Sequence, residues 1–174
     1  MKRNITRWAL VPVLAAIIVV ADQWTKSFIE SNIPMWGFYT PFPALEPWFK
    51  LVHYTNTGAA FGLLRGQSSL FVLIALVVIV AVLAFARQLP TDNWGVRFTL
   101  GLQLGGAVGN LLDRLFKAGQ VTDFLLFTLP VGGKVYAWPA FNIADSSIVV
   151  GVILLGVLIL GSDREPAAGE RVVN

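Results

Sequence analysis

Phe141-Asn142-Ile143-Ala144-Asp145-Ser146-Ser147 sets an amide and a carboxylate at the mouth of the last long apolar run of the chain. An ionisable side chain near the hydrocarbon layer costs about 2.5–3.5 kcal/mol on insertion, so it marks a functional site that faces the protein interior. Asp145 is therefore the first candidate site residue. The remaining question is which groups work with it.

The composition is that of a membrane protein. Hydrophobic residues make up 56% of the 174 positions and charged residues 13%, outside the range of soluble domains. The formal net charge of +3 is small and the basic residues are scattered, which argues against a nucleic-acid partner. The absence of Cys excludes disulfides and thiolate chemistry, and a single His leaves no His-based zinc site, so we expect no metal.

Four apolar runs predict an all-α membrane protein with four transmembrane helices, over about 8–29, 68–86, 98–112 and 142–160. The basic N-terminus resembles a secretory signal, but the first run lacks a convincing cleavage site and is long enough to be retained as a helix. Residues 30–66, rich in Pro, Gly and aromatic residues, predict a small β-containing platform on the periplasmic membrane surface between helices 1 and 2. We expect a single integral-membrane domain over 1–174, with a disordered tail over 162–174.

The third run contains Gly101, Gly105, Gly106 and Gly109. Small residues at this spacing let neighbouring helices approach closely, which predicts a packed interior helix. We hypothesise that this packing leaves a lateral groove for a helical peptide and acyl chains.

In an up-down bundle, spans one and three end on the side where spans two and four begin. Eight polar residues are therefore predicted to converge on one membrane face: Asp22, Lys26, Asn56, Asn110, Arg114, Asp123, Asn142 and Asp145. Asp22 and Lys26 are four residues apart and share a helix face, either as part of the site or as an interfacial ion pair. The strong basic flank of the first span favours both termini in the cytoplasm and the cluster at the outer face.

Two carboxylates on a shared face suggest paired-aspartate chemistry. Like charges at close range cannot both ionise cheaply, so one Asp stays protonated while the other acts as a base. The base activates water and the acid protonates the leaving amine, which hydrolyses an amide without a covalent intermediate. Spacing does not fix the pair. Asp22 has Lys26 nearby and Asp113 adjoins Arg114, which favours Asp123 and Asp145 as the pair without a local cation.

Other functions are compatible with the same residues. A Ser/Lys dyad would use Lys26 with Ser27, Ser146 or Ser147, but a Lys paired with Asp22 stays charged and is a poor base. Intramembrane carboxylates also mark small transporters and proton relays, although here the polar residues gather at one end rather than along a route. A purely structural or partner-binding role is the third alternative.

The sequence resembles the lipoprotein signal peptidase family (signal peptidase II) at motifs that follow one another along nearly the whole chain. These are Asp22-Gln23-Trp24-Thr25-Lys26, Thr55-Asn56-Thr57-Gly58-Ala59-Ala60-Phe61-Gly62, Gly105-Gly106-Ala107-Val108-Gly109-Asn110-Leu111-Leu112-Asp113-Arg114, Val121-Thr122-Asp123-Phe124 and Phe141-Asn142-Ile143-Ala144-Asp145-Ser146. Each motif alone is weak, but five in order make a specific match. The chain departs from the family at Thr122, where members commonly have Val or another residue, and the loop 124–139 varies.

The resemblance implies that Asp123 and Asp145 are the catalytic pair of an aspartyl endopeptidase. It further implies that the supporting residues position the active site and substrate: Asp22, Lys26, Asn56, Asn110, Arg114 and Asn142. The family cleaves prolipoproteins on the N-terminal side of a diacylglyceryl-modified Cys, needs no cofactor, and is an antibiotic target inhibited by globomycin-type peptides. We accordingly expect a monomer in contact with lipid in the bacterial cytoplasmic (inner) membrane.

Overall fold

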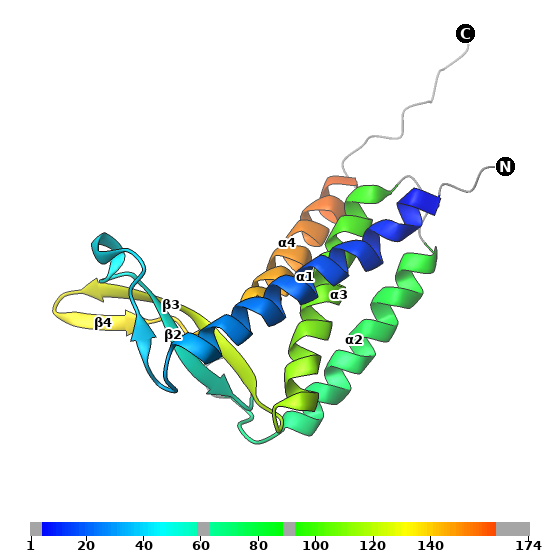
Figure 1. The fold of residues 1–174 in the computed structure, drawn as a ribbon. Helices are drawn as coiled ribbons and strands as arrows, with labels where there is room; N and C mark the ends of the chain where they lie inside the picture. The colour runs from blue at the N-terminus through cyan, green and yellow to red at the C-terminus, as the bar shows by residue number, and fades with distance from the viewer. Residues whose placement is uncertain (1–4, 59–62, 89–92, 163–174) are drawn as a thin grey trace, which may run out of the picture.

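Four helices run alternately up and down, and a small sheet projects from one end of the bundle (Figure 1). The computed structural model describes residues 5–58, 63–88 and 93–162. The helices are α1 (Ile5–Asn32), α2 (Ser68–Gln88), α3 (Trp94–Phe116) and α4 (Ile143–Ser162). All four expected helices are therefore present, each starting or ending within a few residues of the predicted bounds.

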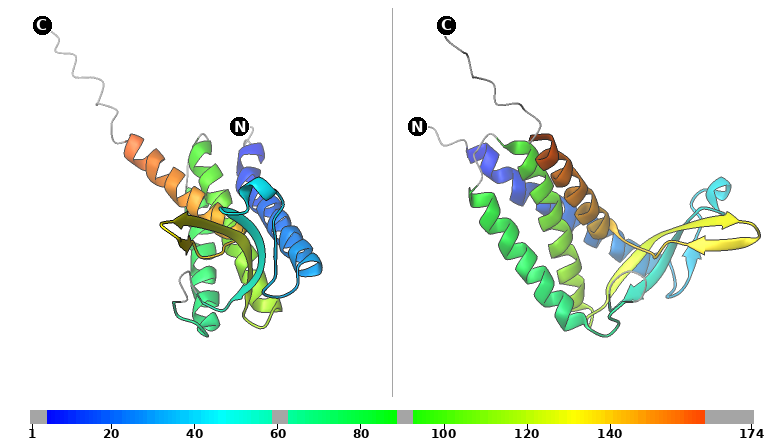
Figure 2. Two further views of the ribbon diagram at one scale, coloured as in Figure 1. Left: turned by 90° about the vertical axis from the view of Figure 1, so that its left-hand side faces the viewer. Right: turned by 180° about the vertical axis from the view of Figure 1, so that it is seen from behind.

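The start of α1 and the end of α4 lie at the same end of the bundle, away from the sheet (Figure 2). Consequently α1 and α3 end, and α2 and α4 begin, at the sheet-bearing end, as the sequence predicts. The expected disordered tail falls, apart from Ser162, outside the described residues, as does part of the second motif at 59–62.

Helix α3 is the interior helix, and its glycines are where its neighbours approach most closely. A Cβ at Gly105 would lie 2.6 Å from Ile18 of α1, and one at Gly106 would lie 2.4 Å from the carbonyl oxygen of Ala144 in α4. Both distances are too short for any larger residue. The prediction of a tightly packed third helix is confirmed, and the close approach brings the polar ends of α1, α3 and α4 together.

Three of the described helices are long and apolar enough to cross a membrane: α1 over Ala9–Asn32, α2 over Ser68–Gln88 and α4 over Ile143–Gly161. Helix α3 does not meet that criterion of hydropathy. Its polar residues include Arg97, Asn110, Asp113 and Arg114. Arg97 and Asp113 are fully buried. The third predicted span thus stays a prediction.

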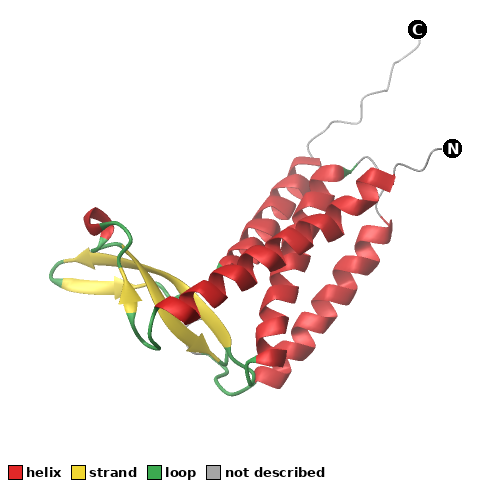
Figure 3. Cartoon of the chain, viewed as in Figure 1, coloured by secondary structure: helices red, strands yellow, loops and turns green. Residues whose placement is uncertain are grey.

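The sheet is larger than predicted and is built from both long connections (Figure 3). Its strands lie in the order β1 (Phe38–Tyr39), β2 (Phe49–Asn56), β3 (Val121–Val131) and β4 (Lys134–Ala137), all antiparallel, with a short 3-10 helix η1 (Pro43–Leu45) between β1 and β2. The predicted β-containing platform over residues 30–66 is present as β1 and β2, but the sequence analysis did not predict that β3 and β4, from the second connection, complete the sheet. The second connection supplies a hairpin whose Gly132-Gly133 turn has positive φ at both positions, as a two-residue hairpin favours.

The β2–β3 pairing shifts register beside the site. Leu51 pairs with Leu125, but Tyr54 pairs with Asp123, so β2 has one residue more than β3 over this interval. An extra residue of this kind bends a strand and redirects nearby side chains. Phe124, which lies within this irregular interval, has no paired residue in β2, and its backbone N–H donates to the carbonyl of Phe141 over 3.0 Å. The strand that bears Asp123 is thereby attached directly to the residues that enter α4.

A small apolar cluster of Ile29, Ile33 and Phe124 supports this junction from the end of α1. Phe124 is 4% exposed, and burying such a side chain contributes roughly 1.5–3 kcal/mol. The packing of Phe124 and the backbone contacts of Phe124 and Leu125 with Phe141 both restrain β3 next to Asp123.

Candidate active site

Asn142 caps the first turn of α4 and defines the position of Asp145. Its side-chain oxygen accepts a hydrogen bond from the backbone N–H of Asp145 (2.9 Å), and its own backbone N–H donates to the Asp145 carboxylate (3.3 Å). This reciprocal pattern is that of a capping box, with Asp in place of Glu or Gln. A capping role alone therefore accounts for part of what holds Asp145 at the helix mouth.

The amide nitrogen of Asn142 reaches the second carboxylate. It lies 2.8 Å from an Asp123 oxygen, 3.2 Å from the Asn110 side-chain oxygen and 3.2 Å from the Thr122 carbonyl. Asn142 is fully buried. One side chain thus connects the helix that bears Asp145 with the strand that bears Asp123.

Asp123 is almost completely buried, and its hydrogen bonds are to neutral amides. Besides Asn142, Asn56 of β2 donates to it over 3.4 Å. Burial, together with the charge of nearby Asp145, raises the pKa of Asp123 from 3.8 to about 7, and the two amide donors oppose that rise. Among the described residues neither Asp123 nor Asp145 takes part in an ion pair.

Asn110 of α3 holds the other carboxylate. Its amide nitrogen donates to Asp145 over 2.7 Å, while its oxygen accepts from Lys26 over 3.1 Å and from Asn142. Because Lys26 and Asn142 are donors and the Asp145 carboxylate is an acceptor, the Asn110 oxygen must face the first two and its nitrogen must face Asp145. Lys26 thereby orients the amide that donates to Asp145.

Lys26 lies at the centre of a fully buried charge cluster. Its ammonium nitrogen is 2.7 Å from Asp22 and 2.9 Å from Asp113, and none of the three side chains is exposed. The predicted Asp22–Lys26 pair is confirmed, and its complete burial rules out the interfacial alternative. The expectation that Arg114 would be the cation beside Asp113 was wrong, because Lys26 and Lys117 occupy that place, at 2.9 and 3.0 Å.

Asp22 also ties the cluster to α4. Its second oxygen accepts the backbone N–H of Ala144 over 3.0 Å, in the first turn of that helix. A carboxylate is favoured there because the first N–H groups of a helix lack intrahelical acceptors.

Arg114 faces the site from the end of α3. Its terminal nitrogens donate to the carbonyls of Asn110 (3.4 Å) and Gly58 (3.3 Å), and its guanidinium carbon lies 5.0 Å from the centre of the Phe71 ring. Its buried Nε has no hydrogen-bond partner among the described residues. The two terminal nitrogens of Arg114 are thus engaged by backbone carbonyls, while its Nε is buried.

The structure brings the eight predicted residues into one network at the sheet-bearing end. It also adds Gln23, which the sequence analysis did not select. The Gln23 amide donates to Asp22 (3.2 Å) and Asp113 (3.1 Å), and to the Gly109 carbonyl (3.2 Å). The signal available for Gln23 was its place inside the first motif, next to Asp22.

Two of the three serines that a Ser/Lys dyad would use, Ser146 and Ser147, donate to backbone carbonyls. Ser146 donates to the carbonyl of Asn142 and Ser147 to that of Ile143, as helix-entry residues do. Lys26 is engaged by two carboxylates and the Asn110 oxygen. This arrangement favours a carboxylate pair over a lysine base.

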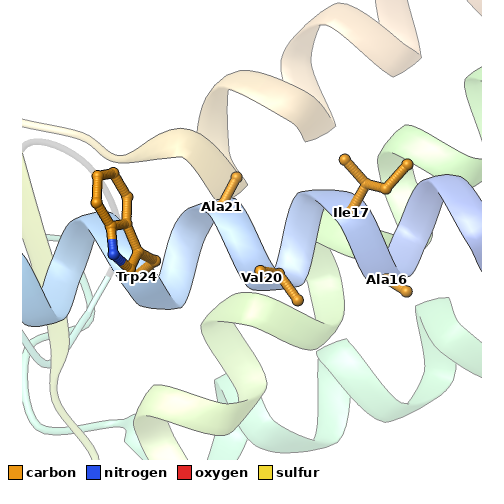
Figure 4. Close-up of a pocket in the computed structure, with 5 residues that line it drawn as sticks. All are labelled: Ala16, Ile17, Val20, Ala21 and Trp24. Carbon is orange, nitrogen blue, oxygen red and sulfur yellow. The ribbon is translucent and has the colours of Figure 1, made fainter.

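An apolar hollow lies on the surface of α1. Ala16, Ile17, Val20, Ala21 and Trp24 line it (Figure 4). The groove hypothesis placed such a feature along α3, whose glycines are instead filled by side chains of α1 and α4. Use of the hollow by a ligand stays a hypothesis.

The sequence matches a known family of peptidases over most of its length. Residues 14–161 match the model of the family described as signal peptidase (SPase) II. Lipoprotein signal peptidases with similar sequences include that of Desulfitobacterium hafniense, 39% identical over 157 residues, which covers 90% of this chain and 96% of the relative. That of Moorella thermoacetica is 40% identical over 142 residues, covering 82% and 87%.

Solved structures also resemble this one. A bacterial membrane enzyme determined by the in meso method at 2.3 Å resolution has a TM-score of 0.77 and 29% identity, over 94% of each chain. A second such enzyme, at 1.9 Å resolution, has a TM-score of 0.71 and 31% identity, over 86% of this chain and 92% of that one. The region that matches the family contains every residue of the polar network.

Proposed function

The chain belongs to the signal peptidase II family of lipoprotein signal peptidases, and from this premise we propose that it is an aspartyl endopeptidase acting through Asp123 and Asp145. Family membership makes it a membrane peptidase of lipoprotein processing. The finer proposal is that it cleaves diacylglyceryl-modified prolipoproteins on the N-terminal side of the lipidated Cys. No cofactor takes part in the proposed reaction.

The observation that supports this mechanism best is the position of Asn142. It donates to Asp123 through its side chain and to Asp145 through its backbone, so it holds two carboxylates that have no ion-pair partner in the described chain. A pKa of about 7 suits Asp123 to hold the proton shared by the pair.

In the proposed reaction, the ionised member of the pair takes a proton from water as the water oxygen attacks the scissile carbonyl carbon. The protonated member gives its proton to the amide nitrogen as the C–N bond breaks. The products are a carboxylic acid at the end of the signal peptide and a free amino group on the lipidated Cys. Each proton taken from water is matched by one given to the leaving amine, so the pair returns to a singly protonated state.

We assign supporting roles to the remaining polar residues. Lys26, with Asp22 and Asp113, would fix the orientation of Asn110 and so the place of Asp145. Arg114, whose terminal nitrogens donate to the carbonyls of Asn110 and Gly58, would hold the end of α3 against the loop after β2 and so support the substrate site.

The membrane placement is also part of the proposal. We take α3 to cross the membrane with α1, α2 and α4, because it packs between them and runs antiparallel to α2 and α4. Both termini would lie in the cytoplasm of a bacterial cell, with the sheet and site near the outer face of the inner membrane. Exposed aromatic residues of the sheet region, which include Trp36, Phe38, Tyr39, Trp48 and Trp138, suit the headgroup layer.

A scissile bond next to a lipid-anchored Cys lies at this same depth. The orientation is checked by placing a cysteine at Thr40 and treating intact cells or spheroplasts with an impermeant thiol reagent. Labelling is expected, and protection would reverse the orientation.

The function is tested with purified protein and a diacylglyceryl-modified precursor. We expect release of the signal peptide, no release from the same precursor without lipid, and inhibition by globomycin. A transporter would instead produce solute or proton flux in sealed vesicles. Flux without cleavage would contradict the peptidase proposal, and cleavage without flux would remove the transporter. We expect the active species to be a monomer in detergent, which light scattering measures.

A further inference from the structure

Thr122, the residue directly before Asp123, has every polar atom engaged. Its backbone N–H donates to Asp113 over 3.2 Å, and its carbonyl accepts the Asn142 amide over 3.2 Å. Its hydroxyl donates to Glu30 and accepts from Lys117 over 3.3 Å. The backbone that precedes Asp123 is therefore held on both its N–H and its carbonyl side, and by its side chain as well.

Two of these partners come from helix ends that are far apart in the sequence. Glu30 belongs to the last turns of α1, and Lys117 follows the last residue of α3. The Lys117 ammonium contacts the Glu30 carboxylate and lies 3.0 Å from Asp113. Glu30, Lys117 and Thr122 thus join α1, α3 and β3 at one point, which we call the Glu30–Lys117–Thr122 clamp.

Lys117 is charged in this setting. Partial burial disfavours its charge, but the hydrogen bonds and charges of Glu30 and Asp113 outweigh that effect and raise the pKa of Lys117 above its ordinary value. The cation is therefore a permanent member of the clamp at neutral pH.

We propose that the Glu30–Lys117–Thr122 clamp positions Asp123 for catalysis by holding the start of β3 against the ends of α1 and α3. The proposal rests on the proposed function, because it assigns positioning residues to the same reaction. None of the three residues needs to contact substrate. They act through the backbone that places the Asp123 carboxylate.

Stability and catalysis respond differently to the loss of such a clamp. Lys117 and Glu30 are each about one-third exposed in their side chains, 30% and 31%, and ion pairs of this exposure contribute little to stability. A small displacement of a catalytic group, in contrast, lowers the rate by as much as about 100-fold. If the clamp positions Asp123, its loss should lower kcat strongly while Tm and KM stay close to the wild-type values.

The test uses two matched pairs of variants in the full-length protein. Thr122→Val keeps the shape of the side chain and removes its hydroxyl, whereas Thr122→Ser keeps the hydroxyl and removes a methyl group. Lys117→Met removes the cation, and Lys117→Arg retains it. Lys134→Met, in β4 beside the exposed hairpin turn, is the control for loss of a lysine outside the clamp.

With the lipidated precursor, we expect kcat to fall about 10-fold in Thr122→Val and in Lys117→Met, with KM within about twofold of wild type. Thr122→Ser, Lys117→Arg and Lys134→Met should retain most of the wild-type kcat. The double variant Thr122→Val/Lys117→Met should lose little more kcat than either single variant, because both substitutions disrupt the same clamp and their effects are not additive. Amide hydrogen exchange over residues 121–124 should accelerate in the two impaired variants.

Wild-type kcat in Thr122→Val and Lys117→Met, in a preparation that cleaves normally, would contradict the inference alone. So would a fall in Tm without a fall in kcat, or equal losses in Thr122→Ser and Thr122→Val, which would indicate packing rather than the hydroxyl. A wild-type protein that leaves the lipidated precursor uncut contradicts the proposed function, and the inference falls with it.

Discussion

The side-chain nitrogen of Asn142 lies 2.8 Å from a carboxylate oxygen of Asp123. The oxygen of the same side chain accepts the backbone N–H of Asp145, and so caps α4. The oxygen of this amide thus caps α4, while its nitrogen contacts the Asp123 carboxylate. Substitutions at this residue are able to separate these two contacts.

Asn142→Ser keeps a good capping oxygen but is too short to donate to Asp123 in the same way. We expect Asn142→Ser to unfold within a few degrees of wild type and to lose about 100-fold in kcat. Asn142→Ala should lose activity to a similar extent and also lose about 1 kcal/mol of stability, because the cap is gone. Thermal unfolding in detergent, beside precursor cleavage, measures both. Full activity in Asn142→Ser would show that the amide contact with Asp123 has no catalytic part.

The raised pKa of Asp123 predicts the pH dependence of activity. Below about pH 7 Asp123 keeps its proton, and above it the pair loses the acid that protonates the leaving amine. We expect kcat/KM to fall as the pH rises through this range. Asn56→Ala removes a donor that favours ionised Asp123, so the pKa should rise further and the fall should move to higher pH. An unchanged profile in Asn56→Ala would argue against Asp123 as the titrating group.

The same shift has a consequence for stability. The pKa of Asp123 is about 7 in the folded protein and near 3.8 when unfolded, so the folded state binds more protons between these values. The free energy of unfolding therefore decreases through this window as the pH rises. Asp123→Asn removes that dependence. We expect it to have a higher Tm than wild type at about pH 8 and a smaller difference at about pH 4, measured by thermal unfolding in detergent.

Removal of Lys26 should be among the most destabilising substitutions at the site. Lys26→Met leaves the buried carboxylates of Asp22 and Asp113 without their shared cation, which typically costs about 3–5 kcal/mol. The triple variant Lys26→Met/Asp22→Asn/Asp113→Asn removes the uncompensated charges and should recover part of the loss. Denaturant unfolding compares the two. Equal stability of Lys26→Met and wild type would mean that the cluster is solvated and not buried.

Gly106 and Gly156 are a matched pair for the helix packing. A Cβ at Gly106 would meet the carbonyl oxygen of Ala144 at 2.4 Å, whereas at Gly156 nothing lies within 4 Å. Gly106→Ala should push the start of α4, and Asp145 with it, away from α3, lowering both Tm and kcat. Gly156→Ala should retain activity and be as stable as wild type or slightly more so. Similar behaviour of the two variants would contradict the close α3–α4 approach.

The helical part of the fold could be predicted because each apolar run carries its own signal. The alternation of four runs then brings Asp22, Lys26, Asn110 and Asn142 to one end without any knowledge of side-chain contacts. The sheet could not be predicted in full. Its central pairing joins β2 to β3 across long intervening helices, and neither segment alone shows that partner.

The partners of Asp113 show where local sequence reasoning fails. Arg114 is its neighbour in sequence but points from the helix in another direction, toward Asn110 and Gly58. Lys117, at the i+4 position, was the usable local signal, since such pairs share a helix face. Lys26 reaches Asp113 only through the packing of α1 on α3, which the glycines permit but do not specify.

The most direct measurement of the central claim is cleavage of a purified diacylglyceryl-modified precursor by wild type, Asp123→Asn and Asp145→Asn, each shown to be folded and inserted. The paired-carboxylate account predicts that wild type releases the signal peptide and that each single variant loses activity by at least about 1,000-fold, because either substitution removes the acid or the base. Normal cleavage by either variant would contradict it.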